Sequence, residues 1–252
     1  MVVGFGTGDE IIRVLSGTIG IRFGPGDSWL IYAYSVPASV FIIVGACNAT
    51  NLIDGLDGLC SGVIGIISVG FLALAVHMHL HSAWGPRDVQ RVVLALALFG
   101  SAVGFLPFNR NPARIFMGDA GSMLLGLNAA ILLLMFADEQ LVNWMIGSVM
   151  VMGLPLADMV LTLVRRWRAQ KPLMAGDRSH FYDQLIDQGF TVRQVVRISY
   201  ALAAIFVLMG MVPIFVRMRH VVLIYGAFFV LLAYVVHRFG MVRVDSPRRV
   251  EG

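Results

Sequence analysis

The stretch Asn48-Ala-Thr-Asn51-Leu-Ile-Asp54-Gly-Leu-Asp57-Gly58-Leu59 decides how the rest of the chain is interpreted, because apolar runs stand on both sides of it. It therefore lies where one membrane segment ends and the next begins. Its two carboxylates, three positions apart, share a face if the stretch is helical, and Asn48 and Asn51 repeat that spacing with amides. Polar groups at a bilayer edge are costly unless a metal, a ligand or water satisfies them. A polar boundary turn that caps two helices is the alternative interpretation.

The composition indicates an integral membrane protein. Of the 252 residues, 58% are hydrophobic and 13% charged, and the mean hydropathy is +0.80, whereas a soluble domain carries about 25% charged residues. The long apolar runs predict an all-α, polytopic helical bundle in contact with membrane lipids. The net charge of +4 comes almost wholly from arginine; basic loops of this kind suit anionic lipid or nucleotide, and no nucleic-acid partner is indicated.

Seven membrane segments are expected, each about long enough for a hydrocarbon core of roughly 30 Å. They are placed near 29–46, 59–76, 89–108, 118–136, 144–164, 199–216 and 221–239. Residues 1–28 are expected to form a membrane-surface hairpin or linker, and no signal peptide is indicated there. The transmembrane domain would span 29–240 with cytoplasmic loops 47–58, 109–117 and 165–198, followed by a cytoplasmic tail at 241–252.

The basic residues predict the orientation. Alternate loops and the tail on one side carry thirteen of the 19 Lys and Arg residues, and the other side carries six. We expect the chain to cross the plasma (inner) membrane several times. The positive-inside rule places the side that is richer in Lys and Arg in the cytoplasm. The opening stretch falls on the same side.

Two further polar clusters fall on this side as well. In Asn109–Ser122, Asp119 stands near the start of a membrane helix between Gly118 and Gly121; it would hold a metal, or it would serve as an ordinary helix cap. In the loop 165–197, the arginines are typical topology anchors. The group Asp177-Arg178-Ser179-His180 combines an arginine, which can donate hydrogen bonds to an anion, with the titratable ring of a histidine. Residues 184–197 predict a short helix, a glycine that stops it and a new helix capped by a threonine.

Together these motifs resemble one family. Asn-x-x-Asn-x-x-Asp-Gly-x-Asp-Gly-Leu at 48–59, Phe-Met-Gly-Asp-Ala-Gly-Ser at 116–122 and Asp-Arg-Ser-His at 177–180 occur in its order and spacing. The chain resembles the polyprenyl-phosphate N-acetylhexosamine-1-phosphate transferases over about residues 2 to 240. The similarity is greater to the branch that makes undecaprenyl-diphospho-N-acetylglucosamine than to the phospho-MurNAc-pentapeptide translocases.

The resemblance implies a reaction and its participants. A UDP-N-acetylhexosamine, with N-acetylglucosamine as the expected sugar, would give its sugar phosphate to polyprenyl (undecaprenyl) phosphate. UMP would leave, and the product would initiate a lipid-linked cell-envelope polysaccharide. Mg²⁺ would be required, with Mn²⁺ as the alternative ion, because phosphoryl transfer depends mainly on positioning and charge neutralisation. A homodimer is left open.

The resemblance also implies roles for residues of this chain. Asp119 would be a metal ligand, and the catalytic residues would be Asp54, Asp57 and His180. Phe116 would stack on uracil, Asn51 and Asn109 would bond to the nucleoside, and Arg178 would act with His180 on the phosphates or sugar. The substrate-binding set is thus Asn48, Asn51, Asn109, Phe116 and Arg178.

Two departures from the family pattern leave alternatives. The translocase branch carries a run of histidines in the last loop, and the N-acetylglucosamine branch usually has His-x-His-His. This chain has His180-Phe181-Tyr182-Asp183 there and keeps only the first histidine, which argues against a pentapeptide substrate and leaves the sugar open. The family also has ten or eleven segments and an Asp-Asp motif that would lie upstream of residue 1. We therefore expect that the sequence is shortened at its N-terminus, by a wrong start site or a truncation, and that its full-length parent is the transferase. Residues 1–252 by themselves are expected not to turn over, although the residues assigned to the nucleotide are all present. The alternatives are a non-catalytic binding remnant and an unrelated transporter; the transporter is disfavoured because Asp158 is the only acid well inside a segment.

Overall fold

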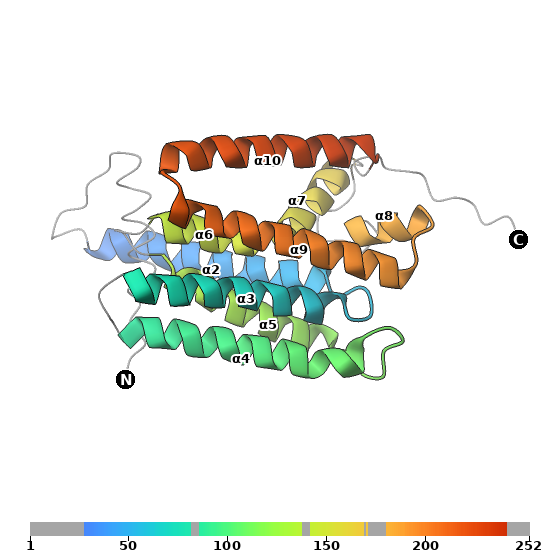
Figure 1. Cartoon of the computed structure of the whole chain (residues 1–252), viewed down its shortest axis with the longest axis horizontal. Helices are drawn as coiled ribbons and strands as arrows, with labels where there is room; N and C mark the ends of the chain where they lie inside the picture. The colour runs from blue at the N-terminus through green and yellow to red at the C-terminus, as the bar shows by residue number, and fades with distance from the viewer. Residues whose placement is uncertain (1–27, 82–85, 138–141, 169, 171–179, 241–252) are drawn as a thin grey trace, which may run out of the picture.

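A bundle of helices makes up the protein (Figure 1). The computed structural model describes residues 28–81, 86–137, 142–168, 170 and 180–240, and these contain nine helices and no strand. The helices are α2 (Ser28–Leu52), α3 (Leu59–His81), α4 (Pro86–Asn109), α5 (Gly118–Met135), α6 (Val142–Val151), α7 (Gly153–Arg168), α8 (Phe181–Asp187), α9 (Val192–Phe215) and α10 (Met218–Arg238). The predicted all-α class is confirmed. The expected surface element before residue 28 and the tail from 241 lie outside the described residues.

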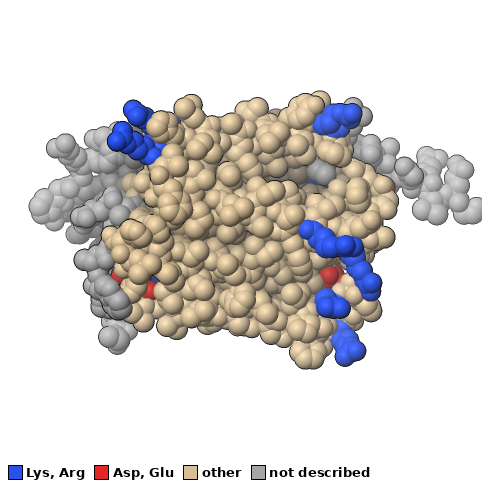
Figure 2. Space-filling view, in the orientation of Figure 1, with Lys and Arg blue, Asp and Glu red and all other residues tan. Residues whose placement is uncertain are grey.

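The membrane segments agree with the hydropathy of the sequence. Six of the described helices are long and apolar enough to cross a bilayer, and a seventh span results if α6 and α7 count as one. On the face shown in Figure 2, charged side chains gather at the two ends of the bundle and leave a broad uncharged band between them. A multi-pass membrane protein presents such a band to the hydrocarbon core.

The fifth predicted segment, 144–164, is not one straight helix. It divides into α6 and α7, which are bent by 67° with respect to each other. Pro155 explains the position of the break, because a proline ring clashes with the carbonyl four residues earlier and supplies no N–H to it. That carbonyl belongs to Val151, the last residue of α6.

Helix α3 forms the centre of the bundle. In the most apolar 18-residue stretch of this helix, 72% of the residues are buried, compared with 6% in the corresponding stretch of α10. Its side chains are apolar on all sides, which is typical of a helix surrounded by other helices. Leu59, Val63, Ile67 and Phe71 are completely buried. Because α3 is packed on all sides, its first residue, Leu59, has a fixed position. The α2–α3 loop, which leads into Leu59, is therefore held at the end of the bundle.

Glycines allow the helices beside α3 to approach closely. A Cβ on Gly126 of α5 would lie 2.8 Å from the Cα of Cys47 in α2. A Cβ on Gly147 of α6 would lie 2.6 Å from the carbonyl oxygen of Gly210 in α9. Small residues at such crossings are how membrane helices gain packing contacts in lipid.

Short polar segments complete the end of the bundle that carries the motifs. The α2–α3 loop, the α4–α5 loop and α8 all lie at this end (Figure 1). The predicted short helix is α8, Gly189 stops it at φ 95°, and Thr191 caps α9 by accepting from the N–H of Gln194. The described parts of the three clusters thus lie at one end of the bundle.

Candidate active site at one end of the bundle

The α2–α3 loop sends its two carboxylates in different directions. Helix α2 ends at Leu52, and Gly58, at φ 79°, turns the chain into α3. The carboxylate of Asp57 accepts hydrogen bonds from the side chain of Asn111 (3.0 Å) and from the N–H of Ala113 (3.1 Å). Asp57 therefore braces the α4–α5 loop, while Asp54 lines a separate pocket. The shared helical face considered from the sequence does not form, because residues 53–58 are not helical.

Asn109 connects the first two clusters from inside the protein. Its side chain is buried, and its Oδ1 accepts from the N–H of Gly58 (3.1 Å) and from the hydroxyl of Ser61 (2.9 Å). Its Nδ2 donates to the carbonyl of Ile115 (3.1 Å). The structure thus places Asn109 where it holds the two loops together.

The other predicted amides lie on the last turns of α2. The hydroxyl of Ser122 in α5 donates to Oδ1 of Asn51 at 2.6 Å, so this amide also joins α2 to α5. Asn51 lines the same pocket as Asp54, whereas Asn48 is exposed.

Asp54 and Asp119 form an acidic pair. Burial, and then the nearby carboxylate of Asp119, raise the pKa of Asp54 to about 6. Asp119 is exposed in the first turn of α5, directly after Gly118, which has a φ of 66°. Neither carboxylate accepts a hydrogen bond from a side chain or backbone group of the described residues. Two carboxylates that repel each other are a natural place for a cation.

The donor set of this pair fits magnesium. Mg²⁺ is usually held by one or two carboxylates, with water and substrate phosphates as the remaining ligands. Within the described ranges, no three His, Cys, Asp or Glu side chains come together as a metal site. The pair therefore offers two of the carboxylate ligands that Mg²⁺ takes, and the described residues alone provide no complete cage here.

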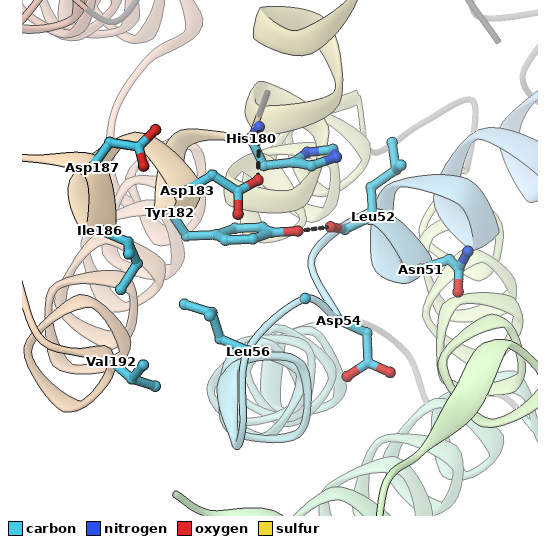
Figure 3. Close-up of a pocket in the computed structure, with 11 residues that line it drawn as sticks. Asn51, Leu52, Asp54, Leu56, His180, Tyr182, Asp183, Ile186, Asp187 and Val192 are labelled. Atoms are coloured by element: carbon cyan, nitrogen blue, oxygen red, sulfur yellow. Dashed lines mark hydrogen bonds between the residues drawn. The ribbon is translucent and has the colours of Figure 1, made fainter. Parts of the chain in front are cut away.

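A polar pocket of about 420 Å³ opens beside Asp54 (Figure 3). His180 and Tyr182 form one wall, with their rings stacked in parallel and the ring centroids 5.3 Å apart. The hydroxyl of Tyr182 donates to the carbonyl of Leu52 at 2.8 Å. The acidic side chains of Asp54, Asp183 and Asp187 line the pocket, and no Lys or Arg is among its described lining residues.

Sequence reasoning missed the group that holds His180. The Oδ2 atom of Asp158, in α7, lies 2.8 Å from Nδ1 of His180, and its Oδ1 accepts from the N–H of Phe181 at 2.9 Å. Thr162, one turn further along α7, places its hydroxyl 3.2 Å from the same nitrogen. The one available signal was that Asp158 is an acid inside an apolar segment, which bears on the transporter alternative but indicates no partner for the side chain.

Two tyrosines that the motifs did not indicate fix the α2–α3 loop. Tyr200 of α9 donates to the carbonyl of Gly58 at 2.6 Å, as Tyr182 does to that of Leu52. A Cβ on Gly55 would lie 2.2 Å from the hydroxyl of Tyr182, and one on Gly62 would lie 2.0 Å from that of Tyr200. The glycines of this region thus leave room for the tyrosines. No sequence signal pointed to this contact.

Phe116 and Arg178 complete the predicted set. Phe116 is 76% exposed in the loop before α5, so its ring is available to a ligand. Arg178 lies outside the described residues. The structure thus brings Asn51, Asp54 and His180 to one pocket, places Asp119 near Asp54, and leaves Asn48 and Phe116 exposed.

An apolar groove of about 840 Å³ lies next to this site. Residues of α6, α7, α9 and α10 line it, and almost all of them are apolar. Asp158, Phe181 and Leu185 line it as well, so the His180 wall separates the groove from the polar pocket.

Comparison with known proteins agrees with the motifs. A family model described as glycosyl transferase family 4 matches residues 2–137. A probable undecaprenyl-phosphate N-acetylglucosaminyl 1-phosphate transferase of Bacillus subtilis is 35% identical over 181 residues, which are 71% of this chain and 47% of the relative. A decaprenyl-phosphate N-acetylglucosaminephosphotransferase of Mycobacterium tuberculosis is 32% identical over 189 residues, or 70% of this chain and 47% of the relative.

A phospho-N-acetylmuramoyl-pentapeptide-transferase of Chlamydia trachomatis is also similar. It is 32% identical over 188 residues, which are 75% of this chain and 53% of that protein. The chain spans about half the length of these curated relatives.

Proposed function

The chain belongs to glycosyl transferase family 4, the polyprenyl-phosphate N-acetylhexosamine-1-phosphate transferases, and from this premise we propose the reaction that it serves. N-acetylglucosamine 1-phosphate passes from its UDP conjugate to polyprenyl phosphate, and UMP is released. An oxygen of the lipid phosphate attacks the phosphorus that bears the sugar. The bond from that phosphorus to the bridging oxygen breaks, and UMP leaves with the electron pair.

The observation that carries this proposal is that two unlike cavities lie on the two sides of the wall that carries His180. The polar pocket lined by Asn51, Asp54 and His180 suits a nucleotide sugar, and the adjacent groove suits an isoprenoid chain. A transferase that joins a water-soluble donor to a lipid acceptor needs both cavities within reach of one reacting centre. The choice of N-acetylglucosamine is supported by the activities for which the Bacillus and Mycobacterium relatives are named.

Magnesium is part of the proposal because of the charge of the pocket. Three acidic side chains and no described Lys or Arg line it, so a diphosphate would meet mainly negative charge. Asp54 and Asp119 are the residues that would hold Mg²⁺. When bound, the ion would neutralise phosphate charge in the pocket.

The remaining residues act by binding and positioning. His180 contacts the sugar or phosphates from the pocket wall, and Phe116 stacks on uracil. Arg178, which lies outside the described residues, keeps the role that the family resemblance implies, on the phosphates or sugar. Asp57 and Asn109 hold the loop that carries Phe116, as their hydrogen bonds to Ala113 and Ile115 support. Asn48 and Asn51 complete the binding surface at the end of α2.

A binding experiment tests the function. Purified protein in nanodiscs is titrated with UDP-N-acetylglucosamine at fixed Mg²⁺, and UMP is used as the competitor. Saturable binding that UMP displaces, and that Asp54→Asn weakens, is the expected result. A folded protein that binds neither compound contradicts the proposal. Release of UMP after addition of undecaprenyl phosphate distinguishes an enzyme from a protein that only binds the nucleotide sugar.

The proposed location is the plasma membrane, with this site on the cytoplasmic face. The excess of Lys and Arg on that side supports it. Single cysteines at the exposed positions Arg114 and Arg219 test it. An impermeant thiol reagent applied to whole cells of a variant without Cys47 and Cys60 should label Arg219→Cys and spare Arg114→Cys; the reverse pattern contradicts the orientation.

A further inference from the structure

We propose that Asp158 is a positioning residue for His180: its carboxylate holds the proton on Nδ1 of the ring and leaves Nε2 as the atom that meets the substrate. The inference rests on the proposed function only for the identity of that substrate, a nucleotide sugar in the polar pocket. The pairing of the two side chains is a separate claim about the protein alone, and it can be tested without a ligand.

The hydrogen bonds around Asp158 determine which nitrogen carries the proton. Its Oδ1 accepts from the backbone N–H of Phe181 and its Oδ2 contacts Nδ1 of His180. An ionised carboxylate accepts hydrogen bonds and cannot donate one, so Nδ1 must bear hydrogen. In the neutral imidazole, Nε2 then holds the lone pair. Nε2 makes no hydrogen bond with the described residues, and the ring lines the polar pocket.

The ring and the backbone of His180 are held by two further contacts. Tyr182 stacks on its face with an interplanar angle of 8° (Figure 3). The backbone N–H of His180 donates to Oδ2 of Asp183 at 3.3 Å, which fixes the start of α8. Only 5% of His180 is exposed. A ring restrained in this way presents one nitrogen in one direction, and such preorganisation is what a binding or catalytic histidine requires.

The environment of Asp158 argues against a purely structural role. The residue is 3% exposed and its neighbours in α7 line the apolar groove. A buried carboxylate is costly even when it is paired, and an apolar residue of similar size often stabilises a protein more. The pair also joins two elements that face different substrates: α7 borders the groove, and His180 borders the polar pocket.

Asp158→Asn should reverse the tautomer of the ring without changing the shape of the side chain. The Phe181 N–H still needs an acceptor, so the amide oxygen should turn toward it. The amide NH₂ group then faces Nδ1 of His180, and Nδ1 has to become the acceptor. The ring proton moves to Nε2, and a nitrogen that accepted a hydrogen bond from the ligand now donates one.

Two measurements test this inference. The first is ¹⁵N NMR of histidine-labelled protein at about pH 8.5, where histidines are ordinarily neutral, with His180→Gln identifying the signal. We expect the Nδ1–H tautomer in the unchanged protein and the Nε2–H tautomer in Asp158→Asn. The second is titration with UDP-N-acetylglucosamine and Mg²⁺. Asp158→Asn should lose about tenfold or more in affinity, because the ligand donor that bonded to Nε2 would face an N–H group and lose its acceptor.

A control variant separates positioning from loss of a buried polar group. Ser148 of α6 is completely buried and bonds only within its own helix, to the carbonyl of Met145. Ser148→Ala should keep both the tautomer and the affinity. An equal loss of affinity in this control contradicts the specific role of Asp158.

The outcomes are distinct for the two proposals. An Nε2–H tautomer in the unchanged protein overturns the inference, even if Asp158→Asn does not fold. A switched tautomer with unchanged affinity overturns the claim that Nε2 meets the ligand. A switched tautomer in a protein that binds no UDP-sugar at all supports the pairing and contradicts the proposed function.

Discussion

Replacement of Phe116 by alanine should separate ligand binding from folding. The ring is 76% exposed, so its truncation removes little packing and should change the free energy of unfolding by about 0.5 kcal/mol or less. Stacking on a nucleotide base is worth about 1–3 kcal/mol. The affinity for UDP-N-acetylglucosamine should therefore fall by about ten- to a hundredfold, since about 1.4 kcal/mol corresponds to a factor of ten.

Phe41 provides a matched control for this experiment. It is the same residue type, is 79% exposed, and lies in the membrane-spanning part of α2, away from the site. Both alanine variants would be titrated with UDP-N-acetylglucosamine and with UMP at the same Mg²⁺ concentration. UMP retains the uracil, so Phe116→Ala should weaken both ligands by a similar factor. Unchanged affinity in Phe116→Ala, or an equal loss in Phe41→Ala, would refute the stacking role.

Magnesium alone should raise the thermal midpoint more at pH 7.5 than at pH 5, and the difference should disappear in Asp54→Asn. The pKa of Asp54 is raised to about 6, so the protonated side chain stabilises the folded state at low pH. This contribution to stability is lost as the pH rises through about 6, where the carboxylate ionises. A bound cation offsets the loss only where the carboxylate is ionised. Equal shifts at both pH values would contradict the site. Tyr200→Phe removes the hydrogen bond to the carbonyl of Gly58 and should lower the free energy of unfolding by about 0.5–1.5 kcal/mol. Each kcal/mol lowers the thermal midpoint by about 2–4 °C, and an unchanged midpoint would contradict that bond. Gly126→Ala should destabilise the α2–α5 contact by roughly 1–3 kcal/mol, whereas Gly104→Ala, with no atom within 4 Å of its Cβ, should stabilise α4 by up to about 1 kcal/mol. Shifts of the same sign in both glycine variants would contradict the packing.

The order of the membrane spans was predictable from the sequence because hydropathy depends on composition along the chain. Each of the seven predicted segments corresponds to a helix or to the bent α6–α7 pair. Alternation of the spans then places the α2–α3 loop, the α4–α5 loop and α8 at one end, without knowledge of any contact. The short helix, Gly189 and the Thr191 cap were predictable for a similar reason, because helix stops and caps depend on neighbouring residues.

The break between α6 and α7 was only partly predictable. Pro155 indicated a kink, but a proline inside a membrane helix is compatible with bends of many sizes. The 67° angle depends on what packs against the break. Gly153 there faces the ring of Phe206 in α9, at a distance that leaves no room for a Cβ.

The roles of the polar side chains required the tertiary structure. The motifs grouped Asp54 with Asp57 and Asn109 with the ligand contacts, yet Asp57 braces a loop and Asn109 is buried between two loops. Asp158 has no motif partner, and its pairing with His180 joins residues 22 positions apart.

The sequence by itself therefore determined the membrane spans, their order and the end of the bundle where chemistry would gather, because these depend on local composition and on the alternation of spans. The direction of each side chain depends on how α2, α4, α5 and α7 rotate against α3, and that rotation is decided by close contacts such as those of Gly126 with α2 and Gly62 with Tyr200. Contacts between residues far apart in the chain leave no periodic signal in it. Only the packed structure could show that Asp54 faces the pocket and that Asp158 holds His180.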